Sequence, residues 1–199
     1  MSLFETVNQK EDGPHPEDAL DNVDGMLPGK GTEGIEVRRL SFSIRPATIG
    51  DYEQLCCVWE VGDALHREAL PHIFRSSGEP SMDRANVQAL IAGPNSAIIV
   101  ADAGGEVVGV VTILEKLVTA TAIKVARRYV EIDSMAVTQS AQRQGVGRAL
   151  IDAAADWAGG RGITRLELNV YEFNQAAGAL YRGAGFSTQN RRMTRQISN

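Results

Sequence analysis

The feature that most constrains this chain is a glycine-containing turn that joins a buried strand to an amphipathic helix. The strand predicted over 129–137 ends in Met135, Ala136 and Val137. The turn that follows consists of Gln142, Arg143, Gln144, Gly145, Val146, Gly147 and Arg148. The helix predicted over 147–157 carries its apolar residues on one stripe. A strand and a one-sided helix in this order bury their apolar faces together, which predicts a mixed α/β fold.

The start of this helix has the properties of a pyrophosphate-binding site. The first backbone N–H groups of a helix have no internal partner and lie at the positive end of its dipole. No Ser, Thr or Asp stands immediately before the helix to cap them. Gly145 and Gly147 allow an anion to approach the backbone, and Arg143 and Arg148 add positive charge. The alternative is that the glycines only allow the helix to pack closely on the sheet.

Two common nucleotide-binding patterns do not fit this turn. A Walker loop needs Gly-Lys-Ser/Thr, which is absent, and a Rossmann fingerprint needs a third glycine where Leu150 stands. A nucleotide-binding regulator is therefore disfavoured. No nucleic-acid partner is expected either, because within residues 41–199 basic residues cluster only at Arg127-Arg128 and Arg191-Arg192.

The chain divides into an acidic N-terminal segment and one domain. Residues 1–40 hold nine acidic and four basic residues, which accounts for the whole net charge of −5. They show no sustained periodicity, so we predict a disordered acidic tail over 1–40 and a single domain over 41–199. The neutral charge of that domain gives no argument for any particular acceptor.

Apolar periodicity and turn residues predict six strands and four helices in the domain. Asp51 is expected to cap the first helix, which Pro71 ends. The other expected helices cover 82–91, 147–157 and 174–182. The expected strands cover 43–48, 97–101, 107–114, 129–137, 165–171 and 186–193.

Composition indicates a cytoplasmic protein that holds no metal. No apolar run approaches the roughly 20 residues that cross a bilayer, and the first residues do not form a secretory signal, so no membrane is expected. The only cysteines, Cys56 and Cys57, are adjacent, which rarely allows a disulfide. Two cysteines and three histidines show no metal-ligand spacing.

Three segments together resemble the GNAT (general N-acetyltransferase) superfamily. The turn at 142–147 resembles its acetyl-CoA motif, Gln/Arg-x-x-Gly-x-Gly/Ala, after a strand that ends apolar-x-Val. Residues 174–186 resemble its cofactor-side helix, Asn-x-x-Ala-x-x-Leu-Tyr-x-x-x-Gly-Phe, and Ile44-Arg45-Pro46-Ala47 resembles its first strand. The resemblance spans about 43–190. It implies an α/β (α+β) fold with a mixed, mainly antiparallel central sheet of about six to seven strands flanked by about four helices.

The resemblance also implies an activity and a cofactor. A family member moves an acetyl group from acetyl-CoA to a primary amine by direct attack in a ternary complex. The backbone of Met135, Ala136 and Val137 would pair with the pantetheine arm of acetyl-CoA, and the turn at 142–148 would bind the pyrophosphate. An alternative is a degenerate member that binds acyl-CoA without turnover.

Tyr181 is the expected proton donor to the departing thiolate. It follows Asn174 by two helical turns, so both side chains face the same side of the helix. A phenol, with an ordinary pKa near 10, suits this proton transfer. Asn174 either bonds the pantetheine arm or only caps its helix.

Glu131 and Asp133 are the candidate general bases. Strand alternation would place both on one face with Met135 and Val137. Two acids in an apolar strand are costly to bury without use. In several family members a glutamate at the position of Glu131 takes the amine proton. Glu131 is equally consistent with a solvated residue beside Arg127-Arg128, and the backbone N–H of Val137 is the expected oxyanion donor.

The acceptor is the least constrained part of the function. A protein amine, a polyamine, an aminoglycoside or an amino acid would all be compatible with the cofactor motifs, and the two acids weakly favour a cationic amine. The resemblance places His66 and His72 in the acceptor-side wall, where each is also consistent with a packing or surface residue. Sheet-edge pairing into a homodimer is common in the family, and no residue here decides it.

Overall fold

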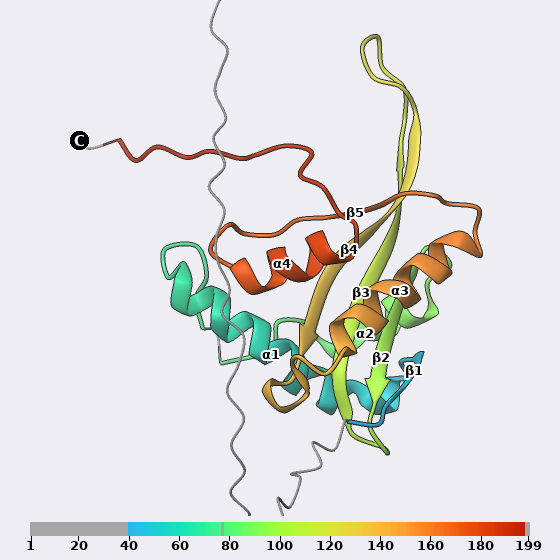
Figure 1. Cartoon of the computed structure of the whole chain (residues 1–199), viewed down its shortest axis with the longest axis vertical. Helices are drawn as coiled ribbons and strands as arrows, with labels where there is room; N and C mark the ends of the chain where they lie inside the picture. The colour runs from blue at the N-terminus through green and yellow to red at the C-terminus, as the bar shows by residue number, and fades with distance from the viewer. Residues whose placement is uncertain (1–39, 77, 198–199) are drawn as a thin grey trace, which may run out of the picture. The chain divides into compact units, whose positions relative to one another are not determined.

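The computed structural model describes residues 40–76 and 78–197 (Figure 1). The acidic tail predicted over 1–40 lies outside these residues except for Leu40, so its disorder stays a prediction. The described residues form one sheet with helices on both faces, which confirms the mixed α/β fold expected from the strand–turn–helix pattern.

The sheet has five strands in the order β1-β2-β3-β4-β5. Neighbours from β1 to β4 are antiparallel, whereas β5 runs parallel to β4, so the mixed, mainly antiparallel topology is confirmed. The predicted count of six to seven strands is too high for the described part of the chain. The strands are β1 (Ser43–Pro46), β2 (Ser96–Asp102), β3 (Val107–Val118), β4 (Arg127–Val137) and β5 (Leu166–Leu168).

The strand predicted over 186–193 does not form. Residues 186–197 belong to no helix or strand and pair with no strand in the described structure. Phe186 is anchored by ring contact with Tyr181, but beyond it the segment is polar and exposed up to Met193. β5 has only three residues, so it offers a short edge for another strand to pair with.

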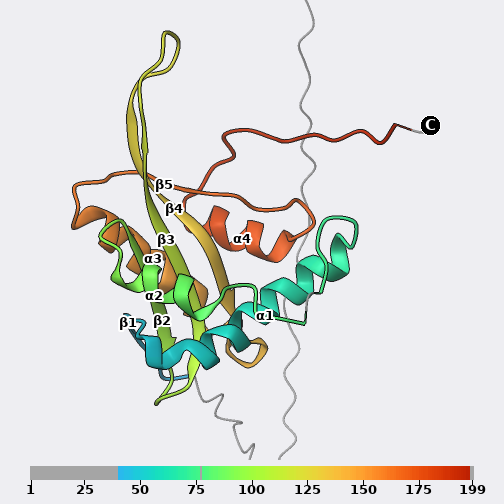
Figure 2. The ribbon, with the colours of Figure 1, turned by 180° about the vertical axis from the view of Figure 1, so that it is seen from behind.

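Four helices flank the sheet, as predicted: α1 (Tyr52–Ala69), α2 (Arg84–Ala92), α3 (Val146–Gly159) and α4 (Gln175–Gly183). Figures 1 and 2 show α3 on one face and α1 with α2 on the opposite face. Alternation along β3 divides the core accordingly, since Val111 packs with Leu150 of α3 and Val110 packs with Leu55 of α1. In the described part of the chain, no helix is long and apolar enough to cross a membrane.

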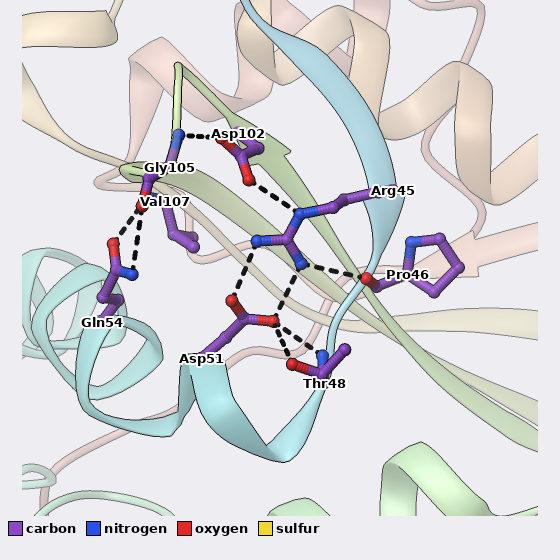
Figure 3. Close-up of polar contacts among 8 residues, drawn as sticks. All are labelled: Arg45, Pro46, Thr48, Asp51, Gln54, Asp102, Gly105 and Val107. Carbon is purple, nitrogen blue, oxygen red and sulfur yellow. Dashed lines mark hydrogen bonds and ion pairs between the residues drawn. The ribbon is translucent and has the colours of Figure 1, made fainter.

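Arg45 ties the first strand to the start of α1 and to β2 (Figure 3). Its guanidinium donates twice to Asp51, at 2.9 Å for each bond, and once to Asp102 at 2.8 Å. The Asp51 carboxylate also accepts from the Thr48 backbone N–H at 2.7 Å, in a short 3₁₀ turn, η1 (Ile49–Asp51). Asp51 is the N-cap residue of α1, as predicted, but its side chain makes no capping bond to α1 because Arg45 and Thr48 occupy that carboxylate.

Candidate active site

The start of α3 presents backbone N–H groups without side-chain caps, as the sequence predicted. Gly145 stands at the N-cap with a left-handed φ of 89°, and Arg143 two residues earlier has φ 63°. The Ala149 N–H donates to the Gly145 carbonyl at 3.0 Å, which is the first turn of the helix ladder. This helix start therefore has the donors and the dipole of an anion site.

The two glycines of the turn have different functions. A Cβ at Gly145 would meet no atom within 4 Å, so this position is open and is constrained by its left-handed backbone. A Cβ at Gly147 would approach Leu180 Cδ2 at 2.9 Å, which shows that this glycine lets α4 pack closely on α3. Gly147 is therefore needed for helix packing, whereas the space beside Gly145 is open to an anion.

The glutamines of the turn hold its backbone. Gln142 Nε2 donates to the Val137 carbonyl at 3.2 Å, which ties the turn to the end of β4. Gln144 Nε2 donates to the Ser140 carbonyl at 2.8 Å, and its Oε1 accepts from the Leu40 N–H at 2.8 Å. Both side chains therefore stabilise the turn rather than project from it.

The two arginines of the turn differ in their freedom to bind phosphate. Arg148 Nε bonds Asp152 at 3.0 Å, and Arg148 Nη1 donates to the Gly183 carbonyl at 3.0 Å. These bonds link α3 to the end of α4, so the predicted phosphate contact by the Arg148 side chain would require breaking them. Arg143 is exposed and forms no ion pair among the described residues, which leaves it as the cation beside the anion site.

The outer edge of β4 pairs with no other described strand near the turn, and its Val137 carbonyl accepts from Gln142 Nε2. The Thr138 N–H donates to Val108 of β3 at 2.9 Å. Because backbone groups alternate in direction along a strand, the N–H and C=O of Met135 and Val137 point away from β3. β5 pairs only with residues 130–132 of β4, so among the described strands nothing pairs with residues 133–137 on that edge. An extended ligand could add to this edge as a strand does.

A β-bulge at Asp133 changes which face of the sheet the two acids, Glu131 and Asp133, lie on. The register passes from Thr112 opposite Ser134 to Ile113 opposite Ile132, so Asp133 has no partner on β3. The extra residue reverses the alternation, and Glu131 shares its face with Ser134 and Ala136 on the α1 side. Met135 and Val137 face α3 instead. The prediction of one shared face is therefore wrong, since sequence alternation assumes a regular strand.

Glu131 is held by two side chains. Lys116 Nζ lies 3.2 Å from Glu131 Oε2, and Asn169 Nδ2 donates to Glu131 Oε1 at 3.3 Å. The neighbouring Arg127 and Arg128 bind Glu167 and Glu115, at 3.1 and 2.7 Å. Glu131 is therefore a half-buried, oriented carboxylate rather than a solvated partner of those arginines, whereas Asp133 is exposed at the bulge.

Tyr181 and Asn174 lie on α4, which packs against α3. Asn174 Oδ1 accepts from the Ala177 N–H at 3.1 Å, so the helix-capping alternative is observed, and its amide nitrogen is left for another partner. The Tyr181 ring is partly buried against the α3 core and lies 5.8 Å from the Phe186 ring. Burial raises the pKa of the Tyr181 hydroxyl, which keeps it protonated at neutral pH.

Four rings meet at the end of α1 and in the loop that follows Asn169, and the sequence identified only one of them. His66 on α1 lies 5.2 Å from Phe74 and 5.5 Å from both Tyr171 and Phe173, measured between ring centroids. The His66 ring is fixed by a 2.7 Å hydrogen bond between Nδ1 and the Gly62 carbonyl. Sequence reasoning also missed Lys116 and Asn169. The alternation of the strand predicted over 165–171 was a signal for Asn169 and Tyr171, but it did not concern Lys116.

His72 lies outside this group of rings. It is exposed after the end of α1 and has no ring contact among the described residues, which matches the surface alternative for this histidine. Cys56 and Cys57 are both free thiols. The described residues contain no group of three His, Cys, Asp or Glu side chains that could hold a metal ion.

Similar sequences extend these observations. A family model described as the acetyltransferase (GNAT) family matches residues 63–186. The chain is 45% identical over 51 residues to aminoglycoside N(6')-acetyltransferase type 1 of Klebsiella aerogenes, a match that covers 26% of this chain and 34% of that protein. It is 26% identical over 113 residues to the uncharacterized N-acetyltransferase YhfO of Bacillus subtilis (strain 168), covering 57% and 73%. The chain thus spans about a third of the first relative's length.

Solved structures share the fold. A mutant of the BH1408 protein from Bacillus halodurans superposes with a TM-score of 0.75 at 25% identity, covering 78% of this chain and 99% of that one. The aminoglycoside N-acetyltransferase AAC(6')-Iy, solved in complex with CoA, gives 0.61 at 15% identity, covering 82% and 99%. The family model matches well over half of the sequence, including the turn and α4. The chain therefore belongs to the GNAT family of acetyltransferase enzymes.

Proposed function

We propose that the protein transfers an acetyl group from acetyl-CoA to a primary amine by direct attack in a ternary complex. One arrangement carries the proposal: the unpaired edge of β4 leads into the uncapped start of α3. An extended ligand that pairs with this edge brings its pyrophosphate end to the helix dipole. Acetyl-CoA has that shape and charge, with an extended pantetheine arm next to a pyrophosphate.

The residues that would bind acetyl-CoA follow from this placement. The backbone of Met135 and Val137 would pair with the pantetheine arm, and the N–H groups that follow Gly145, with Arg143, would bind the pyrophosphate. The Val137 N–H points to the open edge, where it would donate to the acetyl oxygen as negative charge develops there. Acetyl-CoA supplies the activated acyl group, so the reaction needs no metal.

Two side chains would move the protons. Glu131, oriented by Lys116 and Asn169, accepts the proton that the attacking amine loses. Tyr181, protonated at neutral pH, donates its proton to the departing CoA thiolate. Asp133 is the second candidate base, but its exposed position on the bulge holds it less firmly. Most of the rate enhancement would come from holding amine and thioester together.

A thermal-unfolding comparison tests cofactor choice. Only a ligand that binds the folded state raises the melting temperature by mass action. At a concentration a hundredfold above its Kd, bound acetyl-CoA stabilises the folded state by about 2.7 kcal/mol. With the usual entropy of unfolding, this should raise the melting temperature by roughly 5–10 °C. ATP and NAD at the same concentration should raise it much less. An equal or larger rise with ATP or NAD would refute acetyl-CoA as the cofactor.

A thiol-release assay separates the enzyme from a silent acyl-CoA-binding module. With acetyl-CoA and a panel of primary amines, the enzyme releases CoA thiol in proportion to the amine that it acetylates. A binding module would show the thermal shift with acetyl-CoA but no amine-dependent thiol. The panel should include small amines, polyamines, an aminoglycoside, amino acids and peptides with a free N-terminus.

A further inference from the structure

A short stretch of chain leads from the partner of Glu131 to an aromatic surface. Asn169, which bonds Glu131, directly follows β5, and Tyr171 lies two residues further along the chain. Tyr171 contacts His66 and Phe74, with ring centroids 5.5 and 5.7 Å apart. We call His66, Phe74, Tyr171 and Phe173 the aromatic wall. The wall is thus connected to the proposed base by a single loop.

The α1 part of the aromatic wall lies on the face of β4 that carries Glu131. A Cβ at Gly62 of α1 would lie 3.9 Å from Ala136 Cβ, so α1 crosses β4 on the face that Ala136 shares with Glu131. His66 follows Gly62 by about one turn of the same helix. The other rings come from the loop after α1 and the loop before α4. Three separate segments therefore combine into one surface, which the loop after Asn169 links to the proposed base.

This surface exposes apolar side chains to solvent. Tyr171 is 43% exposed, and His66, Phe74 and Phe173 are half-buried. Exposed apolar groups that gather beside a reactive group are typical of ligand recognition. The wall therefore offers apolar and aromatic contact to whatever brings its amine to Glu131.

Two carboxylates that face each other across β4 and β5 are already paired with cations. Glu131 of β4 is paired with Lys116, and Glu167 of β5 is paired with Arg127 and Arg165 at 3.1 and 2.7 Å. An acceptor with several ammonium groups would need several carboxylates with no partner of their own. Binding of a polycation here would have to displace three cationic side chains.

We propose that the acceptor is a small primary amine that carries an aromatic or branched apolar group close to its nitrogen. Its apolar group packs against the aromatic wall while its amine reaches the carboxylate of Glu131. This inference rests on the acetyl transfer proposed above and assigns its substrate class. It differs from the aminoglycosides named for two of the similar proteins, because those are polar molecules with several amines.

A three-amine comparison tests the substrate class. The amines are 2-phenylethylamine, ethanolamine as its polar counterpart, and the aminoglycoside sisomicin. For each, kcat/KM is measured by thiol release, and binding to the CoA-saturated protein is measured by calorimetry. The proposal predicts that 2-phenylethylamine exceeds each of the others about tenfold or more in both measurements, as is usual when a buried apolar group is gained.

Variants of the wall make the test specific. Tyr171→Ala should lower kcat/KM for 2-phenylethylamine about tenfold, mainly through KM, and leave ethanolamine unchanged. Tyr171→Phe should keep the wild-type preference, since it keeps the ring. Leu117→Ala is the matched control, because Leu117 is an exposed apolar residue of β3 outside the wall. It should behave as the wild type.

The outcomes separate this inference from the proposed function. If sisomicin or ethanolamine is preferred, or if Tyr171→Ala leaves the preference intact, the substrate class is wrong even though acetyl transfer stands. If no amine releases thiol but calorimetry still shows the Tyr171-dependent preference, the recognition surface is supported and the transfer reaction is refuted. If neither measurement shows the preference, the inference is refuted.

Discussion

The Tyr181 hydroxyl combines partial burial with a position on α4, the helix proposed to face the cofactor. Burial disfavours the phenolate, so its pKa lies above the ordinary value near 10. A proton donor has to be protonated when the thiolate leaves. Tyr181 is protonated over the whole neutral pH range. We therefore expect its ionisation to lower activity only in strongly alkaline solution.

Tyr181→Phe removes the proposed donor and keeps the ring that packs against the core. We expect kcat to fall about a hundredfold, the usual contribution of a positioned acid, while KM for acetyl-CoA changes little. The measurement is steady-state thiol release between neutral and alkaline pH. Unchanged turnover in the variant would remove Tyr181 from the mechanism.

Thr112 is fully buried in β3, and its hydroxyl has no hydrogen-bond partner among the described residues. Thr112→Val keeps the shape and removes the unsatisfied oxygen, so the free energy of unfolding should rise by about 1 kcal/mol. Thr112→Ser keeps the hydroxyl and deletes a methyl group, so it should lower stability by about 1 kcal/mol. Urea unfolding measures both, and a destabilised Val variant would show that the hydroxyl is satisfied by bound water.

At the scale of elements, Arg45 and Asp51 join β1 to α1 near the edge of the sheet. The Arg45 guanidinium, with the Thr48 hydrogen bonds, holds the pKa of Asp51 well below its usual range. The folded state thus keeps the Asp51 carboxylate ionised at acidic pH values at which the unfolded chain binds a proton there. The resulting stability is complete above an unfolded-state pKa of about 4 and is lost as the pH falls below it.

Asp51→Asn tests this connection between elements. It leaves Arg45 with only Asp102, so stability at neutral pH should fall by about 2 kcal/mol, less than for a fully buried pair because Arg45 is partly exposed. Stability should also depend less on pH below about 4 than in the wild type. Urea unfolding across that pH range measures both effects, and a variant with the wild-type pH slope would contradict the account.

The turn that starts α3 is tested by a pair of glycine substitutions. Gly145→Ala places a side chain at a left-handed φ of 89°, which should cost about 1–2 kcal/mol and weaken acetyl-CoA binding by distorting the N–H groups. Gly159→Ala, at the other end of α3, adds a methyl group in open space and is the matched control. Calorimetry with acetyl-CoA should show loss of affinity only in the Gly145 variant, and equal affinities would argue against this turn as the pyrophosphate site.

The sequence predicted the elements near the cofactor site better than their side-chain contacts. Periodicity identified α3 and β4, and the lack of a cap before α3 is confirmed. The partner of Arg148 could have been anticipated, because Asp152 lies four residues later on the same helix. The bulge at Asp133 could not, because strand alternation in the sequence does not show where an extra residue enters a ladder.

At the scale of the whole domain, the sheet separates two sets of interactions. The outer edge of β4 and the start of α3 form the proposed path for acetyl-CoA, while the α1 side of the same strand carries Glu131. The aromatic wall joins residues from 66 to 173, which only the folded chain brings together. The strand predicted over 186–193 also depends on the folded chain, because a strand forms there only if its partner β5 offers a long enough edge.

The most direct test of acetyl transfer follows the group itself. The protein is incubated with acetyl-CoA labelled in its acetyl group and with 2-phenylethylamine or, if that amine fails, each amine of the wider panel. Labelled product is identified by mass spectrometry while thiol is measured in parallel. We predict labelled N-acetyl amine in equal amount to the thiol released. Thiol without labelled amine, or no product from any amine despite bound acetyl-CoA, would contradict the proposed function.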